Sequence, residues 1–236
     1  MTIDKQQSQD PRPPRRFWII GAGRFGEIAI ERIVDRYPDA SLTVVDRQPA
    51  ATGHAGIRVV QMDGIQWLTT MLGPKAPVDV IVPAIPVHVA AEWLKGNLSE
   101  IYDIHSIKIP ASWRSQLPNA IEGNAGQVYV SHADFICPDN CPEPEKVCTH
   151  TGKPRPLDLF RLLARLKLGH VRPIVLRSRQ LLPGVGGIYP SDLINALGAV
   201  IKSSRHPVMI ATACRCHGVV DFIHLTNKNA RQKRLS

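Results

Sequence analysis

The sequence predicts an α/β fold in which parallel strands alternate with helices that cover both faces of the sheet. Apolar runs of strand length alternate with amphipathic segments of helical length through the first hundred residues. A glycine-rich turn joins the first apolar run to the first amphipathic segment. The chain has 236 residues, 44% of them hydrophobic, which is enough for one large α/β domain or two small ones.

Four strands and three helices are expected in the first half. The strands are predicted at 17–20 (FWII), 41–46 (SLTVVD), 57–63 (IRVVQMD) and 78–84 (VDVIVPA). The helices are predicted at 27–37, 64–72 and 88–95. The first helix is expected to end before Pro38, because the residue preceding a proline disfavours the helical conformation.

The sequence of the second half predicts further strands and two helices around a loop rich in proline and cysteine. The strands are expected at 104–110, 127–136, 173–179, 207–214 and 218–225. The helices are expected at 157–166 and 191–204, and Ser191 is predicted as the N-cap of the second. The cysteine-rich loop spans 137–156, and its prolines exclude a regular strand or helix there.

Composition excludes several classes of protein. Nothing approaches 18 consecutive apolar residues, so we expect no membrane insertion, and the polar N-terminus is not a secretory signal. A cytoplasmic location is therefore expected. Much of the net charge of +9 lies in the two ends of the chain, and aromatic residues are only 6% of the total. Basic ends of this kind are typically solvated, so nucleic acid is an unlikely partner.

The glycine turn has the pattern of a dinucleotide-binding loop. Gly21, Gly23 and Gly26 follow a strand and open a helix, and Asp46 ends the second strand twenty residues beyond Gly26. These glycines permit a tight turn, close approach of a pyrophosphate and close helix packing, and the helix N-terminus attracts the phosphates. A carboxylate at the end of the second strand accepts hydrogen bonds from ribose hydroxyls, which favours NAD over NADP, although neighbouring Arg47 can pair with a 2′-phosphate.

The sequence therefore predicts a Rossmann-type doubly wound parallel sheet, extended by a second α/β half with the cysteine-rich loop. We divide the chain into a leader (1–16), a dinucleotide-binding domain (17–110), a second α/β half (111–227) and a basic tail (228–236). The predicted cofactor-binding residues are Gly21, Gly23, Arg24, Phe25, Gly26, Asp46, Arg47, Pro83 and Ala84. The last two belong to the turn that faces the nicotinamide side in many Rossmann dehydrogenases.

Residues 17 to about 100 also resemble a known family. The segments IIGAGRFGEIAIERI, LTVVDRQP and RVVQMDG are similar to the nucleotide-binding regulatory domain of Trk-type potassium transport proteins. The resemblance includes the Arg24-Phe25-Gly26 ending of the glycine loop and the small-acidic ending of the third strand. It implies a module that binds NAD or NADH and regulates a transport system.

Five cysteines form the second candidate site: Cys137, Cys141, Cys148, Cys214 and Cys216. An odd number of cysteines in a chain without an export signal argues against a disulfide framework. Cys137 and Cys214 each end an expected strand, so both are predicted to open onto the same carboxyl edge of the sheet. Three prolines stiffen the first cysteine segment, as a site that aims several thiolates at one point requires.

Two ligands suit these thiolates, and a third interpretation leaves them free. Four thiolates can hold an iron–sulfur cluster, whereas zinc accepts the same sulfurs or His217 in place of one. Cysteines without any ligand are the remaining interpretation.

The leading interpretation is an NAD-binding oxidoreductase-like protein with an iron–sulfur or metal site near the cofactor. The alternative is a non-enzymatic NAD/NADH-sensing module of a Trk-type potassium transport system or of a redox partner. Because a nicotinamide donates two electrons as a hydride and a single cluster takes one, direct exchange needs a flavin, which points to a flavin- or redox-carrying protein partner. The sequence leaves the enzymatic role open.

Overall fold

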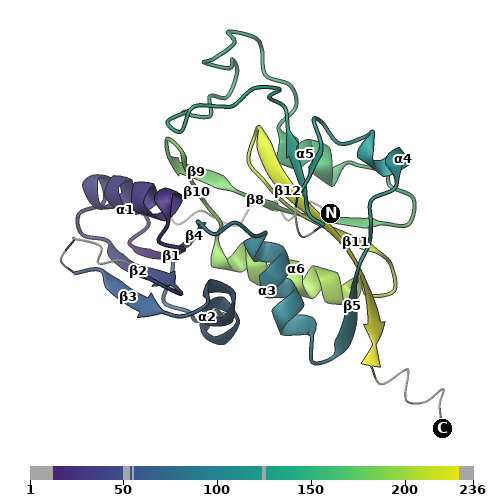
Figure 1. The fold of residues 1–236 in the computed structure, drawn as a ribbon, viewed down its shortest axis with the longest axis horizontal. Coiled ribbons are helices and arrows are strands. Elements are labelled where there is room, and N and C mark those ends of the chain that lie inside the picture. The colour runs from purple at the N-terminus through teal and green to yellow at the C-terminus, as the bar shows by residue number, and fades with distance from the viewer. Residues whose placement is uncertain (1–12, 50–53, 55, 124–125, 229–236) are drawn as a thin grey trace.

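The fold was described from a computed structural model, which defines residues 13–49, 54, 56–123 and 126–228. The described residues form two larger sheets and a two-stranded hairpin, with helices between the larger sheets and on their outer faces (Figure 1). This confirms the predicted α/β class. In the described ranges no helix has both the length and the apolar character needed to cross a membrane.

The first sheet contains four parallel strands in the order β3-β2-β1-β4. Its strands are β1 (Arg16–Ile20), β2 (Ser41–Asp46), β3 (Arg58–Gln61) and β4 (Val80–Pro83), and its helices are α1 (Arg24–Arg36), α2 (Gly64–Met71) and α3 (Val89–Leu98). Asp63 caps α2 by accepting hydrogen bonds from the backbone N–H groups of Ile65 and Gln66, both at 2.9 Å. These elements match the sequence prediction closely, because each strand is an apolar run bounded by turn residues.

The second half forms a separate mixed sheet rather than a continuation of the first. Its strands are β5 (Tyr102–Ser106), β6 (Ile121–Glu122), β7 (Val128–Ser131), β8 (Arg172–Arg177), β11 (Val208–Ala213) and β12 (His217–Asn227). The order is β6-β7-β12-β11-β8, with β5 also paired to β12. Only Cys214, Arg215 and Cys216 separate β11 from β12, and strands joined by so short a turn can pair only antiparallel.

The remaining elements are α4 (Ala111–Arg114), α5 (Leu159–Ala164), α6 (Pro190–Lys202) and an antiparallel hairpin of β9 (Arg179–Leu182) and β10 (Val185–Gly187). Helices α3 and α6 lie between the two sheets (Figure 1), and their buried residues join one apolar cluster with β4, β8 and β11. The hairpin packs beside β4 and α1, and Ile188 pairs with Ile81 of β4.

The structure corrects three details of the sequence prediction. Arg16, assigned to the leader, is the first residue of β1 and pairs with Asp79 at 2.6 Å. The N-cap of α6 is Tyr189 rather than Ser191, because Pro190 takes the first helical position, where its missing N–H costs nothing. Lys228, assigned to the tail, donates to the carbonyl of Ser99 at 2.6 Å. Residues 1–12 of the predicted leader and 229–236 of the predicted tail lie outside the described residues, whereas Arg15 of the leader is described and its N–H donates to Asp79 at 2.9 Å.

Candidate functional site

The glycine turn has the geometry predicted for a dinucleotide loop. Gly21 has a φ of +110°, a backbone conformation that residues with a side chain rarely adopt. A Cβ on Gly26 would lie 2.1 Å from the carbonyl oxygen of Gly21, so the close packing of α1 on the turn requires glycine. A Cβ on Gly23 would meet nothing within 4 Å, so the space above Gly23 is open.

Asp46 lies beside this turn, as expected, but its carboxylate is already used by the backbone. One oxygen accepts from the N–H of Ala22 at 2.7 Å and the other from the N–H of Gln48 at 2.8 Å. Arg47 points to Asp63, with its Nε 2.9 Å from a carboxylate oxygen. That ion pair joins the end of β2 to the start of α2. Asp63 also accepts the backbone hydrogen bond of Gln66, and these bonds outweigh burial and hold the pKa of Asp63 below its usual range.

The turn after β4 closes against the glycine turn. A Cβ on Gly21 would lie 2.6 Å from the carbonyl oxygen of Ala84, and the backbone N–H of Ala84 donates to Ile20 at 2.7 Å. Pro83 is the last residue of β4 and pairs with Ile20 in the parallel register. The predicted cofactor-binding residues therefore lie together at the carboxyl edge of the first sheet.

His88, which follows this turn, is buried rather than exposed. Its Nδ1 lies 2.6 Å from an Asp221 carboxylate oxygen and its Nε2 lies 2.9 Å from the hydroxyl of Thr212. Lys95 adds a contact of 3.2 Å to Asp221. Burial raises the pKa of Asp221, but the hydrogen bond and charge of His88, with Lys95, outweigh it and hold that pKa below the usual range. The network joins α3 to the second sheet.

Replacing Asp221 with asparagine is expected to destabilise the protein by about 3–5 kcal/mol near neutral pH, because it leaves His88 and Lys95 without their buried carboxylate. The folded-state pKa of Asp221 lies below the unfolded value, so its contribution is present above about pH 4 and is lost as pH falls through the folded pKa. Urea unfolding of both proteins should therefore show a stability gap that narrows below about pH 4. A gap that stays constant with pH would contradict the assignment.

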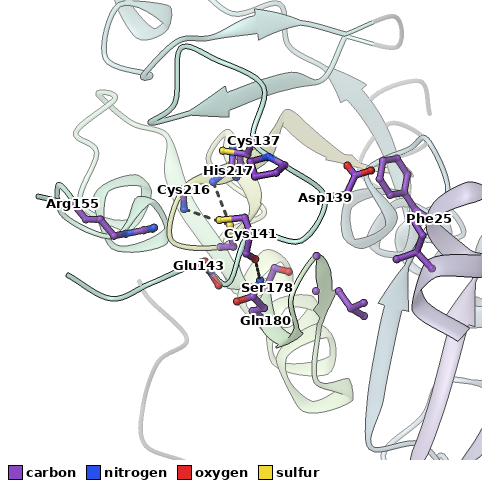
Figure 2. Close-up of a pocket in the computed structure, with 16 residues that line it drawn as sticks. Phe25, Cys137, Asp139, Cys141, Glu143, Arg155, Ser178, Gln180, Cys216 and His217 are labelled. Carbon is purple, nitrogen blue, oxygen red and sulfur yellow. Dashed lines mark hydrogen bonds between the residues drawn. The ribbon is translucent and has the colours of Figure 1, made fainter. Parts of the chain in front are cut away.

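Four of the five cysteines line one pocket, whereas the prediction placed all five at one site. A cavity of about 250 Å³ is bounded by four of them, Cys137, Cys141, Cys214 and Cys216, and by His217, Glu143 and Arg155 (Figure 2). Cys148 does not line the cavity, although it lies within electrostatic range of Cys137. The expected reason for convergence was a shared parallel edge. In the structure the two cysteine segments meet because β12 runs antiparallel between β7 and β11.

The register between β7 and β12 brings the Cys214–Cys216 turn next to the segment that carries the other three cysteines. His217, the first residue of β12, pairs with Ser131, the last residue of β7, and the N–H of His132 donates to the Cys216 carbonyl at 2.8 Å. The cysteine loop, which we define as residues 132–158, starts at this point. The Cys214–Cys216 turn therefore lies beside the base of the loop that carries the other three cysteines.

The cysteine loop has little regular structure and is held by side chains. Arg215 binds it in three places: its backbone N–H donates to Glu143 at 2.5 Å, and its guanidinium contacts Glu145 at 2.9 Å and Asp158 at 3.0 Å. Phe135 stacks on His150 at 4.3 Å between ring centroids. Sequence reasoning missed Glu143, Arg155 and Arg215, because charged residues in a loop carry no pattern that marks their partners.

Two cysteine sulfurs accept backbone hydrogen bonds in the same way. The N–H groups of Cys216 and His217 point to the Cys214 sulfur at 3.4 and 3.3 Å. The N–H groups of His150 and Thr151, with the Thr151 side chain, do the same for Cys148 and hold its pKa below the usual value. In each case the donors are two and three residues after the cysteine. Such bonds stabilise negative charge on sulfur, as a metal-bound thiolate requires.

Burial has the opposite effect on the thiols inside the pocket. It raises the pKa of Cys214 to about 12, with Glu143 adding to the shift, and it raises the pKa of Cys216 and Cys137. Arg155 opposes the shift at Cys216 through a side-chain hydrogen bond. Within the described part of the chain, no three Cys, His, Asp or Glu side chains are already arranged as a group that holds a metal ion. Binding a metal here therefore requires the side chains to move together.

The two candidate sites are neighbours. Phe25 and Ile28 of α1 line the cysteine pocket, and Arg24 pairs with Asp139, which lies between Cys137 and Cys141. Figure 2 shows Asp139 between Phe25 and the cysteines. Thus Arg24 and Phe25, predicted as cofactor-binding residues of the glycine turn, face the cysteine loop.

Comparison with known proteins places the second half in a family. A family model described as "Uncharacterized protein, C-terminal domain" (AF_1314_C) matches residues 90–226, more than half of the chain and a segment that contains all five cysteines. An "Uncharacterized protein" of Archaeoglobus fulgidus is 29% identical over 222 residues, covering 86% of this chain and 96% of the relative. No solved structure matches. The chain therefore belongs to the AF_1314_C family.

Proposed function

We propose that this chain is an NAD-binding, oxidoreductase-like protein whose cysteine pocket holds a thiolate-bound metal or iron–sulfur cluster beside the dinucleotide. The observation that carries the proposal is the adjacency of the two sites through α1. Its first residues form the end of the glycine turn, and Phe25 and Ile28 line the cysteine pocket. A ligand at the turn and a ligand at the thiols would occupy neighbouring space.

The glycine turn supports a dinucleotide of the Rossmann type. The order β3-β2-β1-β4 matches the first four positions of the Rossmann order 3-2-1-4-5-6, in which strands 3-2-1 form one mononucleotide-binding half. The N-terminus of α1 has no side-chain cap, so its unpaired N–H groups remain available to phosphate oxygens. The open space above Gly23 leaves room for the pyrophosphate.

The side chains near Asp46 favour NAD over NADP. The Asp46 carboxylate ends β2, where the ribose hydroxyls of a bound dinucleotide lie. Arg47, the cation best placed to receive a 2′-phosphate, is already paired with Asp63. A 2′-phosphate would therefore meet the Asp46 charge without a free guanidinium to offset it.

Replacing Asp46 with asparagine is the experiment that tests this assignment. We expect NAD affinity to fall by about tenfold, or about 1.4 kcal/mol, and NADP affinity to fall less or to rise, because the repulsion of the 2′-phosphate is removed. Asparagine keeps an oxygen for the Ala22 N–H at the glycine turn, but its amide nitrogen cannot accept from the N–H of Gln48. Calorimetric titration with both nucleotides measures the difference. Failure of the wild-type chain to bind either nucleotide would overturn the proposed function.

The donor set in the pocket supports a metal or cluster. Cys137, Cys141, Cys214 and Cys216 supply sulfurs and His217 an imidazole, which suits zinc or an iron–sulfur cluster. Cys148 does not line the pocket and is not part of this donor set. Zinc would supply a positive charge held by the thiolates, and an iron–sulfur cluster would supply electron transfer. Arg155 would offset the negative charge of the thiolates.

One observation favours the sensing alternative, in which nucleotide binding regulates a transport or redox partner. His88, the histidine nearest the predicted nicotinamide side, is buried, and both of its ring nitrogens already have partners. It is therefore poorly placed to exchange a proton with a substrate. NADH consumption with artificial electron acceptors distinguishes the two: turnover supports the oxidoreductase, and binding without turnover supports the sensor.

A further inference from the structure

Asp139 joins the cysteine loop to α1, the helix that follows the glycine turn. Its carboxylate pairs with Arg24, the first residue of α1. Its carbonyl oxygen accepts from the guanidinium of Arg32 at 3.1 Å, and Arg32 also binds the carbonyl of Pro183. A Cβ on Gly184 would lie 1.8 Å from the same carbonyl, so the tip of the β9–β10 hairpin packs directly on Asp139.

The turn that carries Asp139 also positions two pocket cysteines. Asp139 lies midway between Cys137 and Cys141 in the chain. The N–H of Cys141 donates to Pro138 at 3.0 Å, and the Cys141 carbonyl accepts from Gln180 at 2.6 Å. Asp139 and both cysteines therefore belong to one short turn.

Arg24 pairs with the Asp139 carboxylate and also lies at the start of α1, where the pyrophosphate is proposed to bind. The Asp139–Arg24 pair is exposed, with 73% of the Arg24 side chain and 46% of the Asp139 side chain accessible to solvent. Exposed pairs contribute about 0–1 kcal/mol, so this one is easily exchanged. The pyrophosphate of a dinucleotide at the start of α1 would present two charges to Arg24, and arginine binds phosphate oxygens in a bidentate manner.

We propose that Asp139 couples the two sites by competing with the dinucleotide for Arg24. Nucleotide binding draws Arg24 from Asp139 to the pyrophosphate and loosens the Cys137–Cys141 turn. The coupling is reciprocal, so any ligand that fixes this turn weakens nucleotide binding by the same factor. This inference rests on the proposed function and adds its regulation: nucleotide occupancy controls the accessibility of the pocket thiols.

The test measures thiol alkylation and nucleotide affinity on the same full-length protein. Iodoacetamide labelling of Cys137 and Cys141, followed by peptide mass spectrometry, is compared with and without saturating NAD, and NAD affinity is measured by calorimetry. We expect NAD to speed labelling of both cysteines several-fold. In Asp139→Asn, labelling should already be fast and insensitive to NAD. NAD affinity should rise by about two- to fivefold, which corresponds to about 0.4–1 kcal/mol and lies within the usual range for an exposed ion pair.

Asp134→Asn is the matched control, because it removes the same charge from an exposed residue of the same loop. It should behave as the wild-type protein in both measurements. NAD binding without any change in labelling, or equal affinity in the Asp139 and Asp134 variants, would overturn the coupling and leave the proposed function standing. Absence of NAD binding to the wild-type chain would overturn both.

Discussion

Replacing Gly26 with alanine is expected to disrupt the glycine turn, whereas replacing Gly23 with serine should leave the fold intact and weaken nucleotide binding by tenfold or more. The new Cβ on Gly26 would lie 2.1 Å from the carbonyl oxygen and 2.9 Å from the carbonyl carbon of Gly21. Both are backbone atoms, so relief requires α1 to move from β1. The clash outweighs the roughly 1 kcal/mol that alanine gains over glycine in a helix.

We expect Gly26→Ala to lose about 1–3 kcal/mol of stability, the usual cost of overpacking, and to lose nucleotide binding with it. For a chain of this length each kcal/mol corresponds to a fall in Tm of about 2–4 °C. Thermal unfolding followed by circular dichroism measures the loss. A Gly26→Ala protein with unchanged Tm would show that the turn is looser than described.

Gly23→Ser separates binding from stability. Gly23 is the N-cap of α1, with a φ of −75° that serine adopts readily, and serine is a favoured N-cap residue. Its side chain would enter the open space that the pyrophosphate is proposed to use. We expect an unchanged Tm and NAD affinity reduced by tenfold or more, about 1.4 kcal/mol. Wild-type affinity in this variant would remove the glycine turn as the nucleotide site.

Removal of a pocket cysteine is the second change with a large expected effect. The wild-type chain should bind zinc, or an iron–sulfur cluster when reconstituted without oxygen. Cys137→Ser and Cys214→Ser should each lower the affinity for zinc by about a hundredfold or more, because a hydroxyl is a much poorer ligand than a thiolate. Competition with a chromophoric chelator measures zinc, and visible absorption measures the cluster.

Metal binding should also order the cysteine loop. The side chains must move together to ligate a metal, so part of the binding free energy goes into fixing the loop. Trypsin should therefore cleave after exposed Lys146 faster once the metal is chelated. Ser178→Ala, a change in the same pocket that removes no sulfur, is the control and should bind the metal normally. Equal metal content in the control and cysteine variants would show that these cysteines do not hold the metal and that the pocket contains free thiols.

Most strands and helices followed from the sequence because their information is local. The glycine turn and Asp46 lie in one strand–turn–helix–strand segment, so spacing alone brings them together. The Tyr189 N-cap of α6 was missed because Ser191 is of a type that favours the N-cap, whereas Pro190 takes the first helical position and moves the cap back to Tyr189. The sequence prediction did not include the separate second sheet, because the pairing of β12 with β7 and β5 joins segments that are far apart in the chain.

The amino-acid sequence by itself determined the α/β class, the glycine turn and the presence of two cysteine segments. Only the tertiary structure decided that Arg24 meets Asp139, that Arg215 holds Glu143, and that His88 is buried against Asp221. These pairs are separated by 115, 72 and 133 residues along the chain. Local patterns record which residues form a strand or a helix, but the partner of an isolated charge is set by how sheets and helices pack.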